Sequence, residues 1–418
     1  MDCADPLSEE TLSGNLQIPC FLAGNDPTCC RNSGYDQQHR FRLEIRSKEI
    51  HKMKCILFNL LLMGVGTVTC LPMTAHGEGE ADYQIFLRYA DSPVVEADWT
   101  LTRARVIYKG APATHEERYR VIPCMARLPD GTLVVAVEPG GHEPIFIRSS
   151  DGAKTWSQPY QGALGSEVQT ISTLGVCRDG RLMAVSEKPL RLAYSEDLGE
   201  SWTKGKRVDT GPLQRSWVWT GGRPLELTDG TLVIPVAGYL QSGWLSAGVA
   251  RSTDNGDNWE LVVLGHGNPE NQMIFSEPTL AALADGSLVA LMRTEDRVND
   301  IVPGEPRGER TGLCRVNSTD GGKTWTSPVE TLTGSHGAVV ELPGNILLCG
   351  YHRAPRLAFS SDAGRSWYAN KLWVTDEPRS DWGWYTVVEV VDKKTAIALI
   401  KEMGTPNTIQ ACLLHRRR

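Results

Sequence analysis

The feature that constrains this chain most is an octet that occurs five times and ends each time in tryptophan. The copies are SSDGAKTW (149–156), SEDLGESW (195–202), STDNGDNW (252–259), STDGGKTW (318–325) and SSDAGRSW (360–367). Their aspartates, at positions 151, 197, 254, 320 and 362, are separated by 46, 57, 66 and 42 residues. Because these intervals match a four-stranded blade with variable loops, the repeat predicts a β-propeller.

Each octet has the composition of a hairpin turn. An aspartate can bond its own backbone two residues on, a glycine supplies a positive φ, and the final tryptophan can pack beneath the next strand. In the first copy Ala153 stands where the other copies have glycine, and Gly152 comes one position early. We therefore expect the first turn to differ slightly from the others.

A second repeat lies between the octets and consists of a turn followed by an apolar strand. Its copies are LPDGTLVVAV (128–137), CRDGRLMAVS (177–186), LTDGTLVIPV (227–236), LADGSLVALM (283–292), LPGNILLCGY (342–351) and a weaker VVDKKTAIALI (390–400) that no octet follows. Six such units predict an all-β, six-bladed β-propeller. A strand from around residues 98–108 is expected to close the last blade and remove its exposed edge.

Charge and cysteine content exclude several function classes. The formal net charge is −7 and the basic residues are scattered, which argues against a nucleic-acid partner. Five of the eleven cysteines lie in the repeat region, at 124, 177, 314, 349 and 412, without the spacing of a zinc site. We expect these five to be buried free thiols, and we expect neither a metal nor an organic cofactor.

The N-terminal part contains a segment with the pattern of a secretory signal. Residues 53–77, MKCILFNLLLMGVGTVTCLPMTAHG, have a lysine, an apolar stretch and a small-residue end, and the stretch is too short for a comfortable membrane span. We expect translation to start at Met53 and the product to be exported to the periplasm or secreted. Residues 1–52 are then an upstream artefact or a disordered extension, and residues 78–418 form the propeller.

The five octets resemble the Asp box, or BNR repeat, of the sialidase (neuraminidase) superfamily. The resemblance covers residues 119–402 and implies hydrolysis of a terminal sialic acid, or a related acidic sugar, on a glycoconjugate. In that family three arginines hold the substrate carboxylate, because a planar guanidinium forms paired bonds and stays charged. The nucleophile is a tyrosine paired with a glutamate, an exception among glycosidases.

Two segments resemble the fourth and fifth blades of the family. FSEPTLAALADGSLVALMRTED (275–296) implies that Glu277 is the partner of the nucleophile and that Arg293 binds the carboxylate. HRAPRLAFSSDAGRSW (352–367) implies that Arg353, seven residues before Ser360, is a second carboxylate-binding arginine, with Arg356 as its alternative.

The segment WGWYTVVEVVDKKTAIALIKE (382–402) resembles the last blade. It implies that Tyr385 is the nucleophile and that Glu402 orients an arginine of the triad. An alternative is that Trp382, Trp384 and Tyr385 form an aromatic platform for a sugar or pack in the core.

Two departures from the family pattern concern the first blade. In RYRVIPCMARLPDG (118–131), Val121 separates Arg120 from the Ile-Pro pair, so Arg120 reaches the centre only if the backbone bulges. Arg118 is the alternative for the third arginine. The next loop, EPGGHEP (138–144), lacks the family's general-acid aspartate; Glu143 is our candidate acid, with His142 as the alternative.

Two other functions remain open at this point. A glycosidase or lyase acting on a uronic-acid polysaccharide would also need an arginine-lined pocket. A non-catalytic propeller could instead use the same arginines and tryptophans only to hold an acidic glycan.

Overall fold

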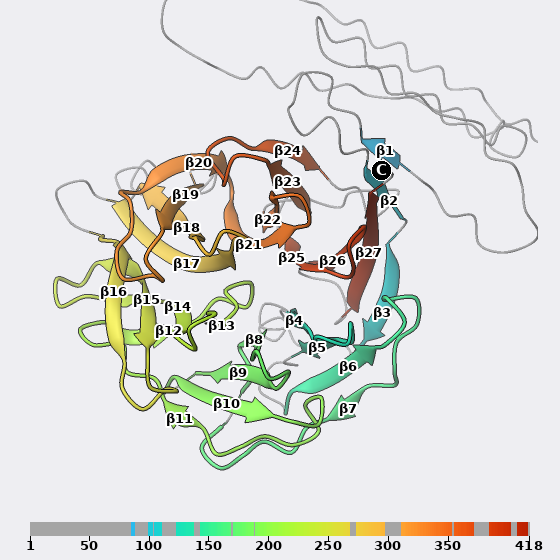
Figure 1. The fold of residues 1–418 in the computed structure, drawn as a ribbon, viewed down its shortest axis with the longest axis horizontal. Helices are drawn as coiled ribbons and strands as arrows, with labels where there is room; N and C mark the ends of the chain where they lie inside the picture. Colours follow the sequence, from blue (N-terminus) through green and yellow to red (C-terminus); the bar gives the residue numbers. More distant parts are fainter. Residues whose placement is uncertain are drawn as a thin grey trace, which may run out of the picture. The chain divides into compact units, whose positions relative to one another are not determined.

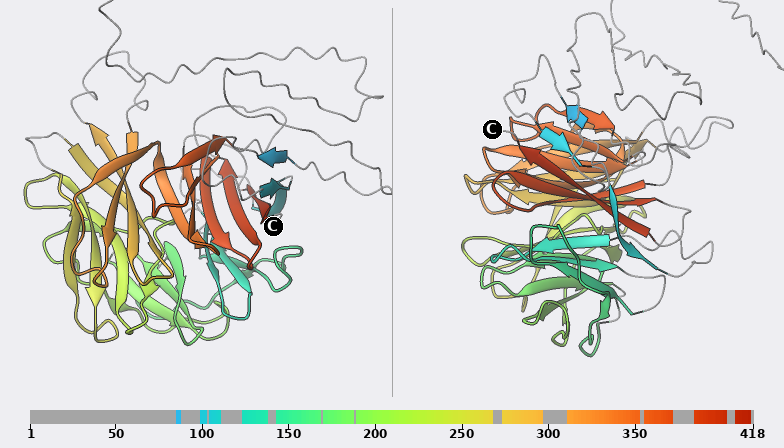
Figure 2. Two further views of the ribbon diagram at one scale, coloured as in Figure 1. Left: turned by 45° about the horizontal axis from the view of Figure 1, so that its top comes forward. Right: turned by 90° about the vertical axis from the view of Figure 1, so that its right-hand side faces the viewer.

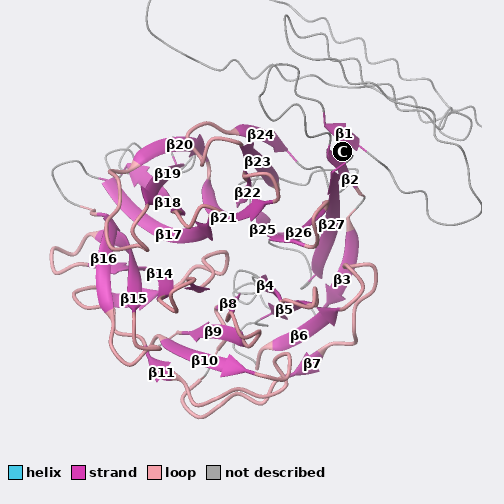
Figure 3. Cartoon of the chain, in the orientation of Figure 1, coloured by secondary structure: helices cyan, strands magenta, loops and turns pink. Residues whose placement is uncertain are grey.

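The computed structural model describes residues 85–87, 99–102, 104–110, 123–137, 143–168, 170–187, 189–267, 273–296, 311–352, 355–371, 384–402 and 408–416. These residues form strands and turns without a helix, arranged as six sheets around a common centre (Figures 1 and 3). No helix among them is long and apolar enough to cross a membrane. The expected signal segment and the extension before it lie outside the described residues, so both stay predictions.

The first three sheets follow one another along the chain. Blade 1 consists of β4 (Pro123–Arg127), β5 (Leu133–Val137), β6 (Ile145–Ser149) and β7 (Tyr160–Gln161). Blade 2 consists of β8 (Thr173–Val176), β9 (Leu182–Ser186), β10 (Arg191–Ser195) and β11 (Lys206–Arg207). Blade 3 consists of β12 (Gln214–Trp217), β13 (Leu225–Glu226), β14 (Leu232–Tyr239), β15 (Leu245–Ser252) and β16 (Glu260–Gly265).

The remaining sheets complete the ring, which Figure 2 shows from two further directions. Blade 4 consists of β17 (Met273–Ala282), β18 (Leu288–Asp296), β19 (Thr311–Ser318) and β20 (Val329–Thr333). Blade 5 consists of β21 (Ser335–Leu342), β22 (Ile346–His352), β23 (Arg356–Ser360) and β24 (Tyr368–Lys371). Blade 6 consists of β25 (Trp384–Val390), β26 (Thr395–Glu402) and β27 (Thr408–Arg416), joined by β1 (Ile85–Leu87), β2 (Trp99–Leu101) and β3 (Arg105–Lys109).

The ring closes at blade 6. Strands β2 and β3, from the N-terminal part of the described chain, both pair antiparallel with β27, which is the last strand (Figure 1). The predicted six-bladed propeller and its closure by a strand near residues 98–108 are therefore confirmed. The closure satisfies the backbone of β27, which would otherwise be an exposed edge.

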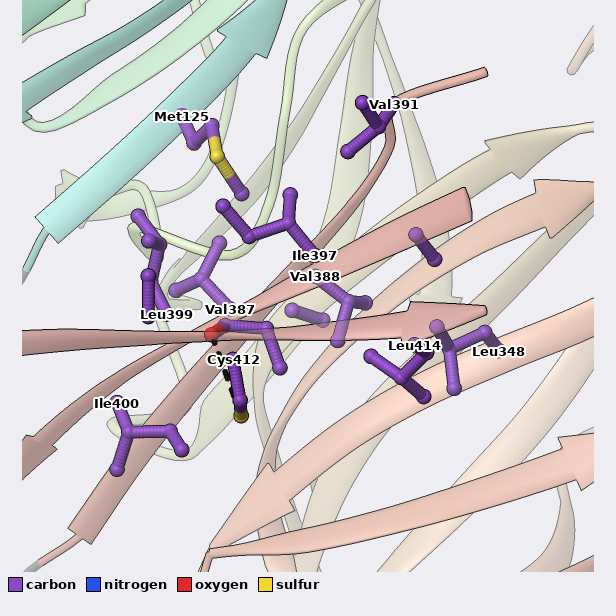
Figure 4. Close-up of a cluster of buried hydrophobic side chains, with 14 of the residues drawn as sticks. Met125, Leu348, Val387, Val388, Val391, Ile397, Leu399, Ile400, Cys412 and Leu414 are labelled. Atoms are coloured by element: carbon purple, nitrogen blue, oxygen red, sulfur yellow. Dashed lines mark hydrogen bonds between the residues drawn. The ribbon is translucent and has the colours of Figure 1, made fainter. Parts of the chain in front are cut away.

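The hydrophobic core lies between blades rather than inside them. Each buried cluster combines one face of a blade with the facing side of the next, and the largest joins blades 5, 6 and 1. Figure 4 shows part of that cluster, where Met125 of blade 1 lies near Ile397 of blade 6. The five cysteines of the propeller are buried and free, as the sequence predicted.

The octets form hairpin turns, but with a different hydrogen-bond span from the predicted one. In each turn the aspartate carboxylate accepts a bond from the backbone amide four residues on, as Thr155 does for Asp151 at 3.0 Å. The predicted bond to the amide two residues after the aspartate does not form, because the two residues that follow each aspartate both have positive φ. The backbone reverses direction only after them, so the amide four residues on faces the carboxylate. The first copy keeps this shape with Ala153 at φ 66°.

The strand registers define two ends of the ring. The first strand of each blade begins, and the second ends, at one end; for example Ser276 pairs with Arg293, and Tyr385 with Lys401. The octet turns lie at the other end, where Ser149 pairs with Leu133. We call the end that carries Ser276, Arg293 and Tyr385 the site end.

Candidate functional site

Blades 4 and 5 begin with the same backbone irregularity. The pairing of β17 with β18 shifts between Ser276 and Thr279, and the pairing of β21 with β22 shifts after Ser335. The residue after each serine has a left-handed backbone, with φ 50° at Glu277 and φ 54° at His336. A bulge of this kind re-aims a side chain, and such strained residues concentrate at functional sites.

The two re-aimed side chains meet. The Glu277 Oε1 atom lies 3.0 Å from His336 Nε2 and accepts a 3.1 Å bond from Arg293 Nη1. The other guanidinium nitrogen of Arg293, Nη2, contacts the carboxylate of Glu295. Oε2 of Glu277 is buried and accepts no hydrogen bond from any residue that the structure describes.

The environment of Glu277 keeps its carboxyl group charged. Burial on its own would raise the pKa, but the neighbouring His336 and Arg293 outweigh it, so the pKa of Glu277 lies below its ordinary value. Glu277 is therefore an ionised, oriented carboxylate at neutral pH.

Tyr385 reaches the same place from blade 6. Its buried ring lies 5.3 Å from the His336 ring, edge to face, and 5.4 Å from the Trp219 ring of blade 3. The Trp219 ring also lies 4.7 Å from His336. Side chains of blades 3, 4, 5 and 6 thus converge in one cluster at the site end.

The segment 219–223, which contains Trp219, contacts blades 2, 4, 5 and 6 and so occupies the centre of the ring. Trp219 Nε1 donates to Gly337 O of blade 5 at 3.1 Å, and Arg223 forms a 2.8 Å ion pair with Glu389 of blade 6. A Cβ on Gly222 would lie 2.4 Å from the Pro278 carbonyl oxygen of blade 4, so only glycine fits there. The segment therefore packs against the side chains of the cluster from the centre of the ring.

Three of the predicted site residues lie together: Glu277, Arg293 and Tyr385. Glu143 is exposed and precedes β6 at the site end, in the loop where the acid was predicted. Arg356 belongs to β23, the third strand of its blade, and its guanidinium lies 5.9 Å from the Tyr351 ring.

The remaining predicted residues fall outside this description. Arg118, Arg120, His142, Arg353 and Trp382 are not among the described residues, and of Trp384 and Glu402 only the backbone is described. Glu402 ends β26 at the site end, opposite Trp384. Their predicted roles stay predictions.

The sequence interpretation missed His336, Glu295 and Trp219. A signal for His336 was present: Ser335-His336 stands at the start of blade 5 as Ser276-Glu277 stands at the start of blade 4. Among the described residues no group of acidic, histidine and cysteine side chains could hold a metal ion.

The sequence is similar to those of known carbohydrate-active proteins. Residues 184–378 match the BNR repeat-like domain family. A sialidase of Bacteroides fragilis is 25% identical over 247 residues, which cover 54% of this chain and 41% of the relative. A sialidase of Paraclostridium sordellii is 24% identical over 226 residues, 44% of this chain and 54% of the relative, so the chain spans about half the length of these relatives.

Solved structures share the fold. A Hadza microbial sialidase superposes with a TM-score of 0.55 at 19% identity, covering 74% of this chain and 68% of that chain. An α-L-arabinanase of Penicillium chrysogenum gives a TM-score of 0.55 at 14% identity, with 76% and 98% covered. A protein of unknown function from Dyadobacter fermentans gives 0.56 at 19% identity, with 75% and 99% covered.

The repeat turns, the closed ring and these similarities define the class of protein: a six-bladed β-propeller built from BNR repeats. Within that class, the chain is similar in sequence to two sialidases and shares its fold with a third.

Proposed function

We propose that this protein is a glycoside hydrolase that cleaves a terminal sialic acid, or a related acidic sugar, from a glycoconjugate. The observation that carries the proposal is the convergence of Glu277, Arg293 and Tyr385 from blades 4 and 6 at one end of the ring. The sialidases among its curated relatives support the substrate class.

In the proposed reaction the phenol oxygen of Tyr385 attacks the anomeric carbon and the bond to the leaving oxygen breaks. The phenol proton passes to Glu277, whose lowered pKa keeps it ionised and whose Oε2 atom is the oxygen not engaged by Arg293 or His336. Glu143 donates a proton to the leaving oxygen, and water then cleaves the bond between tyrosine and sugar. A phenol avoids the repulsion that a carboxylate nucleophile would meet next to the substrate carboxylate.

One observation favours a second candidate, hydrolysis of a neutral sugar. Both Nη atoms of Arg293 already contact carboxylates, those of Glu277 and Glu295, so the charge of this guanidinium is balanced within the protein. A substrate carboxylate would have to compete with Glu295 for the same donors. Neutral-sugar enzymes, an α-L-arabinanase and an α-L-arabinofuranosidase, share the fold.

Hydrolysis of two fluorogenic substrates by the purified full chain tests these candidates. The proposal expects release of 4-methylumbelliferone from the α-sialoside, and the second candidate expects release from the α-L-arabinofuranoside. Binding of sialic acid without hydrolysis of either substrate would contradict both and indicate a glycan-binding propeller. Formation of an unsaturated product from a uronic-acid polysaccharide would instead identify a lyase.

A further inference from the structure

His336 is bound through both nitrogens of its ring. Nε2 lies 3.0 Å from Glu277 Oε1, and Nδ1 lies 2.8 Å from the hydroxyl oxygen of Ser335, which is buried. The Trp219 and Tyr385 rings pack against the imidazole. Nε2 also lies 3.4 Å from Arg293 Nη1. The ring is therefore held in orientation by these three polar contacts and by two aromatic contacts.

The contacts assign the proton on Nε2. Glu277 is ionised and can only accept, so His336 Nε2 carries the hydrogen that faces it. A serine hydroxyl can donate to Nδ1 or accept from it, so Ser335 tolerates both the neutral ring and the imidazolium. In either charge state, His336 presents one N–H to the same carboxylate oxygen.

This contact decides which oxygen of Glu277 is available for chemistry. Arg293 and His336 both bind Oε1, and the carboxylate plane is fixed by donors from two different blades. Oε2 is thereby left for the proton of Tyr385 in the proposed reaction. Loss of the His336 contact would free the carboxylate to rotate about its terminal torsion, which is a soft one.

We propose that His336 is a positioning residue for the proposed reaction: with Ser335 behind it, it holds the Glu277 carboxylate oriented and ionised for Tyr385. The inference rests on the proposed function. Glu277 also pairs with Arg293 of β18, which contacts Glu295 of the same strand, and Tyr385 of β25 packs against His336. Among the described residues, Arg293 remains to favour the charged carboxylate when His336 is removed, while Glu295 opposes it.

The first test is the pH profile of kcat/KM on the substrate that the wild type hydrolyses. We expect His336→Ala to lower kcat roughly 100-fold with little change in KM, because a misaligned catalytic group costs about that much. We also expect the acid limb of its profile to move to higher pH, since one of the neighbours that lower the pKa of Glu277 is gone.

Two further variants separate positioning from packing. His336→Gln keeps an N–H donor near Nε2 and should recover about tenfold of the lost kcat, and Ser335→Ala should lose part of kcat by freeing the ring. His415→Ala, which removes a half-buried histidine of β27 bonded to Thr395, should leave both parameters unchanged. Wild-type kcat and an unmoved acid limb in His336→Ala would overturn the inference. If His336→Ala does not fold, the same result in both His336→Gln and Ser335→Ala would overturn it.

A second test does not depend on turnover. Melting temperatures of wild type and His336→Ala, measured from pH 7 downward, should differ most above pH 4.5, the ordinary pKa of a glutamate, and should converge as pH falls through the lowered pKa of Glu277. A difference that is the same at every pH would overturn the inference. If the protein hydrolyses neither substrate but the melting temperatures converge at low pH, the proposed function is wrong and the contact between His336 and the charged Glu277 is supported.

Discussion

Glu277 is a charged side chain that the fold removes from water and compensates with two partners. Only 13% of its side chain is exposed, and an uncompensated carboxylate there would be protonated at neutral pH. Arg293 and His336 reverse that tendency, and the pKa falls below its ordinary value instead. Because the folded pKa is lower than the unfolded one, the charge stabilises the fold above pH 4.5 and ceases to do so as pH falls through the folded pKa.

The variant Glu277→Gln tests this charge. At pH 7 it should lower the free energy of unfolding by about 3 kcal/mol, because Arg293 loses a buried partner. At an acidic pH below the lowered pKa of Glu277 the deficit should shrink, because the wild-type carboxyl group is then neutral too. Denaturant unfolding at both pH values measures the deficit, with Glu200→Gln as control for an exposed ion pair, where under about 1 kcal/mol is expected. An equal deficit at both pH values would contradict the assignment.

Tyr385 is expected to contribute its hydroxyl group to chemistry and its ring to packing. Tyr385→Phe keeps the ring contacts with Trp219 and His336, so the fold and substrate binding should survive while turnover falls by several orders of magnitude. Steady-state kinetics and thermal melting measure the two effects. Tyr160→Phe, which removes a hydroxyl bonded to Leu198 O near the opposite end, is the control. Full activity in Tyr385→Phe would exclude this nucleophile.

At the scale of the element, the octet hairpin repeats with little variation. The serine hydroxyl bonds the aspartate, the aspartate collects backbone amides, and each of the four later tryptophans donates Nε1–H to the glycine carbonyl three residues before it. In these four turns the second left-handed residue is glycine, with φ from 79° to 93°. In the first turn that position is Ala153 at 66°.

The substitution Ala153→Gly should therefore stabilise the protein. A non-glycine residue in the left-handed region costs about 1 kcal/mol, and most of that cost should be recovered. The reverse change in another turn, Gly256→Ala, should destabilise, since φ is 81° there and a Cβ would lie 3.3 Å from Trp259. Chemical denaturation measures the free energy of unfolding of both variants. A loss of stability in Ala153→Gly would show that the backbone at Ala153 is not strained in the wild type.

The turn tryptophans join adjacent blades. Trp202 is buried, and its ring stacks 5.9 Å from Phe146 of the preceding blade. Trp202→Ala should cost roughly 3–5 kcal/mol, and Trp325→Ala somewhat less because that ring is only partly buried. Thermal melting of the two variants shows which one loses more stability. Unchanged melting in both variants would mean that the octets do not bind the blades together.

The repeats made the fold predictable, because each unit carries its own turn signal and apolar strand. The site was predictable only in part. The resemblance to sialidases pointed to Glu277, Arg293 and Tyr385. It did not point to His336, which gains its place from the same kind of bulge as Glu277, a feature that a strand pattern does not contain. The segment 219–223 was missed because it has no counterpart in the other repeats, so no comparison between blades points to its central position.

At the scale of the whole molecule, the described residues give no blade a core of its own. Each of their buried clusters belongs to two or more blades, so each sheet is stable only between its neighbours. The segment 219–223 adds bonds from blade 3 to blades 2, 4, 5 and 6. A closed ring of this kind should unfold as one unit, unlike an open array of repeats.

Closure by β2 and β3 is the contact on which that cooperativity depends. Trp99, Leu101 and Tyr108 of these strands are buried in the cluster that joins blades 5, 6 and 1, and the Trp99 ring stacks 5.7 Å from Phe359. A chain that begins at residue 111 would lose all three side chains, each worth roughly 2–5 kcal/mol when truncated. It would also leave β27 as an unpaired strand at the edge of blade 6.

We expect this shortened chain to melt at a much lower temperature than the full chain and to associate through the β27 edge. A synthetic peptide of residues 97–110 should bind it, restore most of the melting temperature and suppress association, because the peptide supplies β2 and β3, the two strands that pair with β27. A peptide with Trp99 and Tyr108 replaced by serine is the matched control, since its backbone can pair but its side chains cannot fill the core. Calorimetry measures the melting temperature and light scattering measures association.

A shortened chain that stays monomeric and melts like the full chain would show that blade 6 is complete without its N-terminal strands. Packing between blades 6 and 1 would then be sufficient to close the ring.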